Sequence, residues 1–282
     1  MPLRVSRGRI LAWLSLIAAT LVVLNLAAHL FTAVTGHDHV RGLIPLLDLD
    51  LESNLPSLYG AFLLLAAAAL VALQAAILHA RRGPDRQLWT GLALVLLAMA
   101  FDEVASAHEL LTEPMRELLG AGRPRILHFA WIVPGALAAA AFAWLYRGFF
   151  ARLPDPVRPR VLLAALVYLG GAVGVEMVGG YYAAANSTGT FVYKALLVGL
   201  EEGLEMAGVI LFIGAMLLQL ALTAPALSVQ FAASAPARRD RRFPARAAMP
   251  AADAPASGHP APPSAAWAAQ AGAIPRTGAR KA

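Results

Sequence analysis

The sequence lacks cysteine and is poor in charge, and both absences narrow what the protein can be. Without cysteine there are no disulfides, no thiolate metal ligands and no cysteine nucleophile. Only 14% of the residues are charged, compared with about a quarter in an ordinary soluble domain. Hydrophobic residues make up 59% of the chain. They gather in runs of about 20, the length that a helix needs to span a bilayer, which indicates an integral membrane protein.

Six apolar stretches are long enough to cross the hydrocarbon core as helices. They cover residues 10–34, 57–80, 88–110, 126–147, 161–183 and 194–222. The first follows a basic segment, as the apolar region of a signal peptide does, but it is longer than the usual ~7 to 15 residues, so we expect it to remain uncleaved. The predicted fold is an all-α, polytopic membrane bundle with six transmembrane helices.

The net charge of +6 fits a membrane topology better than it fits nucleic-acid binding. With the N-terminus in the cytoplasm, 18 of the 23 Lys and Arg residues fall on the inner side. We therefore predict cytoplasmic termini and a multi-pass protein of a bacterial-type inner (plasma) membrane, with the lipid bilayer and no nucleic acid as its partner. Residues 223–282 hold nine of the nineteen prolines, which predicts a disordered cytoplasmic tail after a transmembrane domain over 1–222.

Seven acidic residues lie within the predicted spans, where helix packing alone does not require them. They are Asp102, Glu103, Glu109, Glu176, Glu201, Glu202 and Glu205. A helical rise of about 1.5 Å per residue puts acids from three spans at nearly the same depth, in the outer half of a core about 30 Å thick. Asn25 and His29 fall at or just above this level, and His108 and His128 lie nearer the outer edge.

Helical spacing predicts that these acids share common faces. Two stripes follow i, i+4, i+7 spacing: Asp102, Ser106 and Glu109 in the third span, and Glu201, Glu205 and Gly208 in the sixth. In the fifth span, Gly170 and Gly174 have the spacing that lets helices approach closely, so Glu176 should face protein. A charge near the bilayer centre costs about 2.5 to 3.5 kcal/mol. Because Lys194 is the only Lys or Arg in the spans apart from Arg147 at an inner end, protons, bound cations, histidines or water must neutralise the acids.

The first interpretation is a metal-dependent membrane enzyme that acts on a lipid-like or outer-face substrate. Carboxylate and imidazole ligands together suit Mn, Fe or Zn, whereas an all-oxygen set suits Mg or Ca. The metal-binding or proton-binding residues are then Asp102, Glu103, His108, Glu109, Glu176, Glu201, Glu202 and Glu205, with His29, His128, Asn25 and Ser106 as additional members. No catalytic residue is assigned, because the sequence has neither Glu-x-x-His nor His-Glu-x-x-His.

Two alternatives stay open. In a proton- or cation-coupled transporter, the same acids would line a pathway, although they occupy only the outer half and no inverted repeat is evident. In a structural membrane protein, protonated acids would hydrogen-bond neighbouring helices.

The first outer loop, residues 37–60, carries Asp48, Asp50 and Glu52 before Asn54 and Pro56. This pattern predicts a turn or short interfacial helix that leads into a helix started by proline. The acids are either solvated loop charges or, in the case of Glu52 together with Asn54, part of a lid over the polar site.

Three segments carry a resemblance to a family. They are "LLDLDLESNLPSLYG" (46–60), "FDEVASAHE" (101–109) and "EEGLEMAG" (201–208). Their motifs, DLDxExNxP, FDExxSxHE and EExxEMxG, resemble those of an uncharacterised family of bacterial six-span membrane proteins. The resemblance covers most of the membrane domain and implies the six-span fold, but it supplies no activity.

Overall fold

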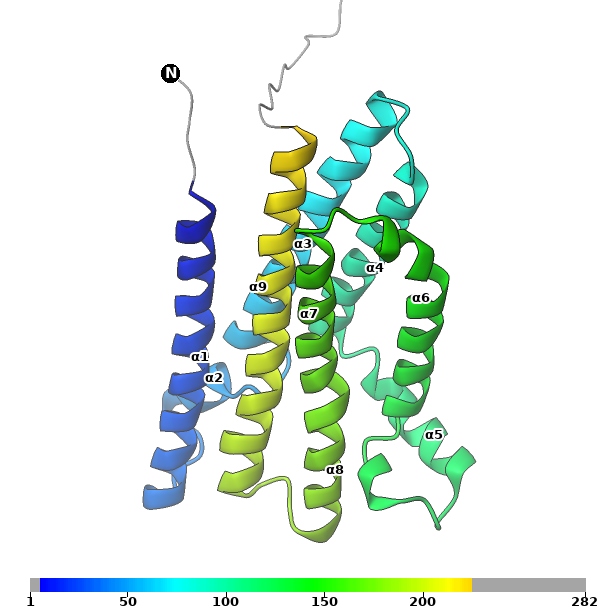
Figure 1. Cartoon of the computed structure of the whole chain (residues 1–282). Helices are drawn as coiled ribbons and strands as arrows, with labels where there is room; N and C mark the ends of the chain where they lie inside the picture. The colour runs from blue at the N-terminus through cyan, green and yellow to red at the C-terminus, as the bar shows by residue number, and fades with distance from the viewer. Residues whose placement is uncertain (1–5, 225–282) are drawn as a thin grey trace, which may run out of the picture. The chain divides into compact units, whose positions relative to one another are not determined.

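The computed structural model describes residues 6–224, and within this range the regular structure is helical, without strands (Figure 1). Six helical segments there are long and apolar enough to cross a membrane, which confirms the predicted number. They are Arg7–Thr35, Leu55–Ala80, Arg86–Ala105, Ile132–Arg152, Arg158–Ala185 and Val192–Thr223. The predicted tail lies outside the described residues, apart from its first two.

Nine α-helices and five shorter 3-10 or π segments make up this described part. The α-helices are α1 Arg7–Thr35, α2 Leu43–Leu47, α3 Leu55–Ala80, α4 Arg86–Ala105, α5 Thr112–Leu119, α6 Ile132–Arg152, α7 Arg158–Leu169, α8 Glu176–Ala185 and α9 Val198–Thr223. The 3-10 segments are η1 Val40–Gly42, η2 Glu109–Leu111 and η3 Arg125–Leu127, and the π-helical segments are η4 Gly170–Val175 and η5 Val192–Leu197.

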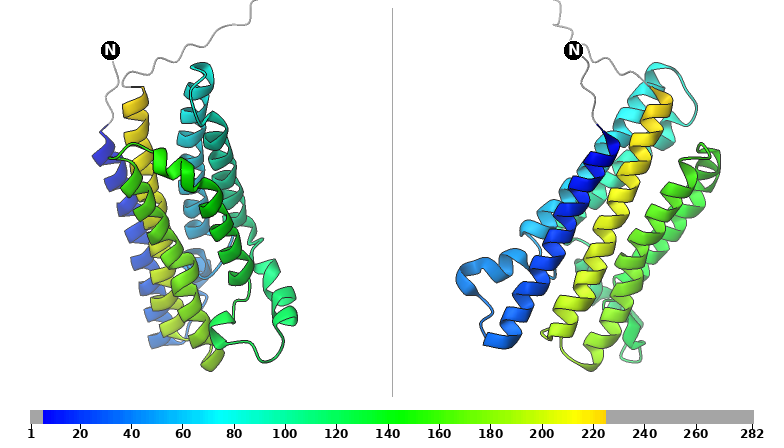
Figure 2. Two further views of the ribbon diagram at one scale, coloured as in Figure 1. Left: turned by 45° about the vertical axis from the view of Figure 1, so that its right-hand side comes forward. Right: turned by 60° about the vertical axis from the view of Figure 1, so that its left-hand side comes forward.

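Helix α9 is the packing centre of the bundle, because it contacts α1, α3 and α7 (Figures 1 and 2). Helices α3 and α4 form a second extensive pair. The first helix begins and the last helix ends at the same end of the bundle (Figure 1). Following the predicted topology, we call this the inner end, and we call the opposite end, where α1 finishes and α3 begins, the outer end.

The tightest part of the core lies between α3 and α9. Four of its residues are almost completely inaccessible: Leu63, Ala67 and Val71 of α3, and Met216 of α9. Together with Ile213 they form what we call the apolar layer. Toward the inner end, Gln74 and Gln219 each donate a side-chain hydrogen bond of 3.1 Å to the Thr223 hydroxyl. The apolar layer therefore separates the two ends of the bundle.

Close helix approach in the fifth span depends on a glycine other than the predicted pair. Gly170 and Gly174 have open space where a Cβ would lie, so the prediction for them was wrong. A Cβ on Gly171 would instead lie 2.7 Å from the Glu201 carbonyl oxygen of α9. Gly171 lies three residues after Tyr168, which packs on Gly208 of α9, so the two positions share the side of the helix that faces α9.

The third and fourth spans also differ from their predicted limits at the outer end. Helix α4 ends at Ala105, because Ser106 adopts a left-handed conformation with φ of 47°. The chain then turns through η2 and α5 before α6 begins at Ile132. The predicted stripe of Asp102, Ser106 and Glu109 is therefore not formed, since only Asp102 is on the helix.

Gly208 provides a direct test of this packing, because a Cβ there would lie 2.7 Å from the Tyr168 backbone nitrogen of α7. Backbone atoms cannot move aside as a side chain can. We expect Gly208→Ala to lower the free energy of unfolding by about 1 to 3 kcal/mol. The matched Gly174→Ala variant has open space and should be neutral or stabilising by up to about 1 kcal/mol. Thermal unfolding in detergent measures both, and equal stability of the two variants would contradict the packing.

Candidate functional site

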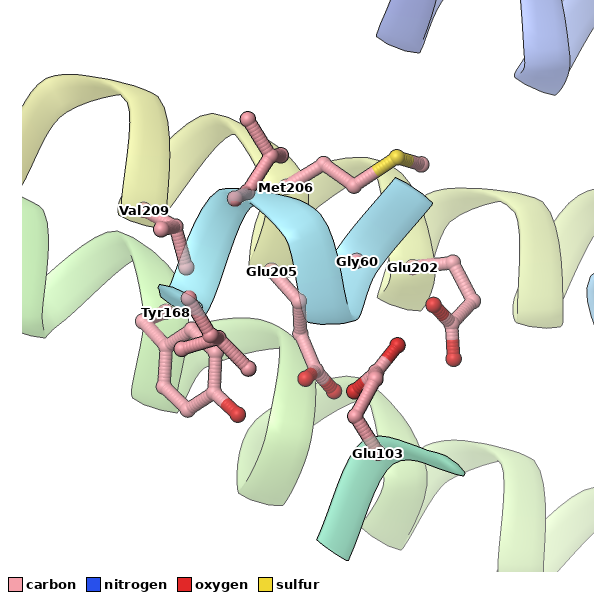
Figure 3. A pocket seen from close by; sticks show the side chains of 9 residues that line it. Gly60, Glu103, Tyr168, Glu202, Glu205, Met206 and Val209 are labelled. Atoms are coloured by element: carbon pink, nitrogen blue, oxygen red, sulfur yellow. The ribbon is translucent and has the colours of Figure 1, made fainter. Parts of the chain in front are cut away.

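Three glutamates from two helices converge on one small cavity (Figure 3). Glu103 of α4 faces Glu202 and Glu205 of α9, and their carboxyl groups turn toward one another. The Tyr168 hydroxyl of α7 completes the polar part of the lining. Apolar residues line the rest, including Leu63, Leu64, Met206 and Val209. The centre of a water molecule can occupy about 10 Å³ of this cavity, so the cavity has room for about one water.

Glycine makes room for these carboxyl groups. A Cβ on Gly60 of α3 would overlap the Glu103 carboxylate, so Glu103 can reach the cavity only because position 60 lacks a side chain. Gly171 has the corresponding role on the other side, where a Cβ would lie 3.1 Å from Glu205 Cγ. The Glu201, Glu205 and Gly208 stripe faces α7 and η4, as the helical spacing predicted.

Glu176 and Glu201 form a second carboxyl pair next to this cavity. Their side chains lie next to each other, and two ionised carboxylates at such close range would repel. The Trp131 indole nitrogen donates a further hydrogen bond of 3.2 Å to Glu176 Oε1. Glu176 therefore faces protein, as predicted, and η4 ends immediately before it.

Asp102 and His108 form a separate pair at the outer end of α4. Asp102 Oδ2 lies 2.9 Å from His108 Nδ1, and Asp102 Oδ1 accepts a 2.9 Å hydrogen bond from the His108 backbone nitrogen. The His108 ring packs on Trp131 with a centroid separation of 4.6 Å. Trp131 thus connects this pair to Glu176, and helical spacing alone gave no indication of its role.

The outer loop is held by a buried ion cluster. Asp48 is 3% exposed, so it is not a solvated loop charge. Its carboxylate accepts a 2.9 Å hydrogen bond from Lys194 Nζ and lies 3.1 Å from His29 Nε2. Burial alone would raise the pKa of Asp48, but the hydrogen bonds to His29 and Lys194 outweigh it and hold the pKa below its ordinary value. The only Lys or Arg in the outer half of the described spans is therefore paired with the loop.

Asn25 and Asp50 extend this cluster. The buried Asn25 side chain donates to the Lys194 carbonyl and accepts from the Leu49 backbone nitrogen, each at 3.1 Å. Asp50 Oδ2 lies 3.4 Å from Lys194 Nζ, and Asp50 is also near Tyr193. Burial raises the pKa of Asp50 to about 6, although Lys194 opposes the rise. Asn25 and His29, predicted as additional site members, thus anchor the loop.

Glu52 and Asn54, the predicted lid residues, have different surroundings. Asn54 caps the start of α3 in a capping box with Ser57, and its amide also donates to the Asp48 carbonyl at 2.6 Å. Glu52 lies near Ser106 and His108 at the end of α4. Burial raises the pKa of Glu52, and the nearby His108 opposes the rise. Only Glu52 therefore reaches the polar groups.

The remaining predicted residues lie at the outer edge. Glu109 starts η2, outside the membrane-spanning helix. His128 packs on Phe129 and on Gly180, and its backbone carbonyl accepts a 2.8 Å hydrogen bond from Arg116 Nε. Burial lowers the pKa of His128, and Arg116 adds to the effect. Neither residue lines the carboxylate cavity.

No salt bridge connects Glu103, Glu176, Glu201, Glu202 or Glu205 to a Lys, Arg or His within residues 6–224. In the same range, no three His, Asp or Glu side chains are already arranged to coordinate a metal ion. The glutamates thus form an acidic centre without a protein counter-charge.

The fold and this centre together define the class of protein. It has six helices that are apolar enough to span a membrane, and a cluster of carboxyl groups lies toward one end of the bundle. Residues 13–220 match the family described as Domain of unknown function (DUF8692), and the chain belongs to that family. No curated protein and no solved structure matches the chain.

Breaking the buried ion cluster should destabilise the protein. In Asp48→Asn, Lys194 loses its best partner, and we expect a loss of about 2 to 3 kcal/mol at pH 7. A lowered pKa contributes stability above the unfolded-state value, and this contribution is lost as pH falls through the folded-state pKa. The difference from wild type should therefore shrink below about pH 4.

Asp155→Asn removes the exposed pair with Arg158 and serves as the control, with an expected change of less than about 0.5 kcal/mol. Unfolding in detergent at several pH values measures both variants. A loss in Asp48→Asn no larger than in the control would contradict the buried ion cluster.

Proposed function

We propose that this protein is a metal-dependent enzyme embedded in a bacterial-type inner membrane, with cytoplasmic termini and a substrate that approaches from the outer side. The observation that carries the proposal is the convergence of Glu103, Glu202 and Glu205 on one cavity without a neighbouring cation. Ionised carboxylates in apolar surroundings require a counter-charge. A divalent cation at this position would supply it to all three groups at once.

The donor atoms favour particular metals. The cavity offers carboxylate oxygens and the Tyr168 phenol oxygen, whereas His29 and His108 are paired with aspartates elsewhere. An all-oxygen set suits Mn²⁺ or Mg²⁺ better than Zn²⁺. Among the Mn, Fe and Zn expected from the sequence, Mn is therefore the best fit. Binding would require the glutamate side chains to rotate further into the cavity.

The carboxyl groups of the cavity and those beside it would have different roles in the enzyme. Glu103, Glu202 and Glu205 would hold the metal, which supplies Lewis acidity or a more acidic water when bound. The neighbouring Glu176 and Glu201 carboxyl groups lie beside the cavity and would exchange a proton with a reacting group. We infer a lipid-like substrate from the position of the site among apolar helices.

Transport is the alternative use of the same carboxyl groups, and the apolar layer argues against it. Below the cavity, Ala67, Val71 and Met216 are almost completely inaccessible. Gln219 is 14 residues beyond Glu205, or about 21 Å along α9, and no titratable side chain of α9 lies between them. A pathway to the inner end would have to cross this layer. The geometry therefore favours a site that opens to one side.

Elemental analysis of the purified protein tests the proposal. We expect near-stoichiometric Mn, or Mg when Mn is absent, in the wild type. The triple variant Glu103→Gln, Glu202→Gln and Glu205→Gln should lose it, because amides keep the shape but remove the charge. Glu117→Gln on the exposed face of α5 is the matched control and should retain metal.

Two results would contradict the proposal. Metal retained in the triple variant would place it elsewhere, and absence of metal from a well-folded wild type supplied with Mn²⁺ and Mg²⁺ would remove the metal centre. In the second case, a pH-gradient-driven flux in proteoliposomes would support the transporter. A protein with neither metal nor flux would support protonated acids with a structural role.

A further inference from the structure

Asp102 holds His108 by two hydrogen bonds that fix the form of the imidazole. The carboxylate accepts from His108 Nδ1 at 2.9 Å and from the His108 backbone nitrogen at 2.9 Å. Because the carboxylate is an acceptor, the Nδ1 atom must carry a hydrogen. In the neutral ring this leaves a lone pair on Nε2, which is the arrangement of a histidine that accepts protons.

The backbone at the end of α4 is shaped to bring these groups together. The left-handed conformation of Ser106, with φ of 47°, reverses the chain direction, and His108 then returns to Asp102. The other side of the imidazole packs on Trp131, whose indole nitrogen is itself fixed by the 3.2 Å hydrogen bond to Glu176. The ring is thus held from two directions.

Accessibility distinguishes this pair from the other histidine–aspartate pair in the protein. The side chains of His108 and Asp102 are 28% and 38% exposed, whereas those of His29 and Asp48 are 6% and 5% exposed. The buried pair also includes Lys194, which serves to anchor the loop. The exposed pair has no Lys or Arg partner among the described residues.

We infer that Asp102 and His108 form a general acid–base pair at the outer surface of the bilayer, with His108 as the catalytic residue and Asp102 as its positioning residue. Taken with the lipid-like substrate proposed above, the pair would act on an ester bond in the headgroup of that lipid. This assignment rests on the proposed enzymatic function and specifies the reaction as hydrolysis.

In this hydrolysis, His108 removes one proton from water and later returns it to the leaving oxygen. His108 Nε2 takes a proton from water, whose oxygen forms a bond to the electrophilic atom of the ester. The bond from that atom to the leaving oxygen breaks, and the leaving oxygen receives the proton back from Nε2. Asp102 stabilises the intervening imidazolium. Glu52, which lies near Ser106 and His108, belongs to the loop that a headgroup would meet there.

Diethyl pyrocarbonate tests the pair, because it acylates an accessible imidazole nitrogen that has a free lone pair. The full-length protein in detergent is treated at pH 7, and modification of each histidine is followed by peptide mass spectrometry. His108 should react at least as fast as His39 of the outer loop, although His39 is more exposed. The buried His29 should react slowly. A His108 rate as slow as that of His29 would overturn the inference.

Asp102→Asn separates a catalytic arrangement from a purely structural one. The amide oxygen can still accept from the His108 backbone nitrogen, so the turn is kept. The amide can also donate a hydrogen bond to Nδ1, so the ring hydrogen is no longer held on Nδ1 and Nε2 loses its free lone pair for part of the time. Acylation of Nε2 should therefore slow by about tenfold or more relative to His39. Asp102→Glu restores a carboxylate and should recover part of the rate. An unchanged rate in Asp102→Asn would show that Asp102 only caps the turn.

Metal content measured in the same samples keeps the two proposals distinct. Normal His108 reactivity in a protein without metal would count against the metal centre alone. Bound metal together with an unreactive His108 would count against the acid–base pair alone.

Discussion

The structure is organised around carboxyl groups that lie among apolar helices without a neighbouring cation. Glu103, Glu202 and Glu205 meet in one cavity, and Glu176 and Glu201 pair beside it. Such groups are unfavourable unless a proton, a cation or water compensates them. The glycines at positions 60 and 171 bring the helices close enough for the acids to meet. The tight packing at this level therefore serves the acidic centre.

The outer loop explains why that centre has no protein counter-charge. Lys194 is the only Lys or Arg in the outer half of the six described spans, and it is bound by Asp48 and Asp50 instead of by the glutamates. Asn25 and His29 strengthen this arrangement from α1. The loop thus has two effects at once: it ties α1 to the start of the sixth span, and it keeps the lysine away from the cavity.

The number of spans and the layer of acids were predictable, because apolar run length and helical rise determine both. The Glu201, Glu205 and Gly208 face was also predictable, since α9 is a regular helix there. The third-span stripe was not, because the left-handed Ser106 ends the helix after Asp102. The interpretation of Asp48 as a solvated loop charge was wrong, because the residue is buried and its pairing across 146 residues leaves no local pattern. Tyr168 and Trp131 carried no signal beyond apolar packing.

The π-helical segment η4 sets the relation between Tyr168 and Glu176. In an uninterrupted α-helix, eight residues turn through about 80° beyond two full turns, and the two side chains would point in different directions. The wider π turns hold more residues each and take up much of this difference. Whether both side chains face α9 depends on the number of residues between these two positions more than on which residues they are. Within the family, an insertion or deletion at Gly170–Val175 would therefore alter the centre more deeply than most substitutions in the same segment.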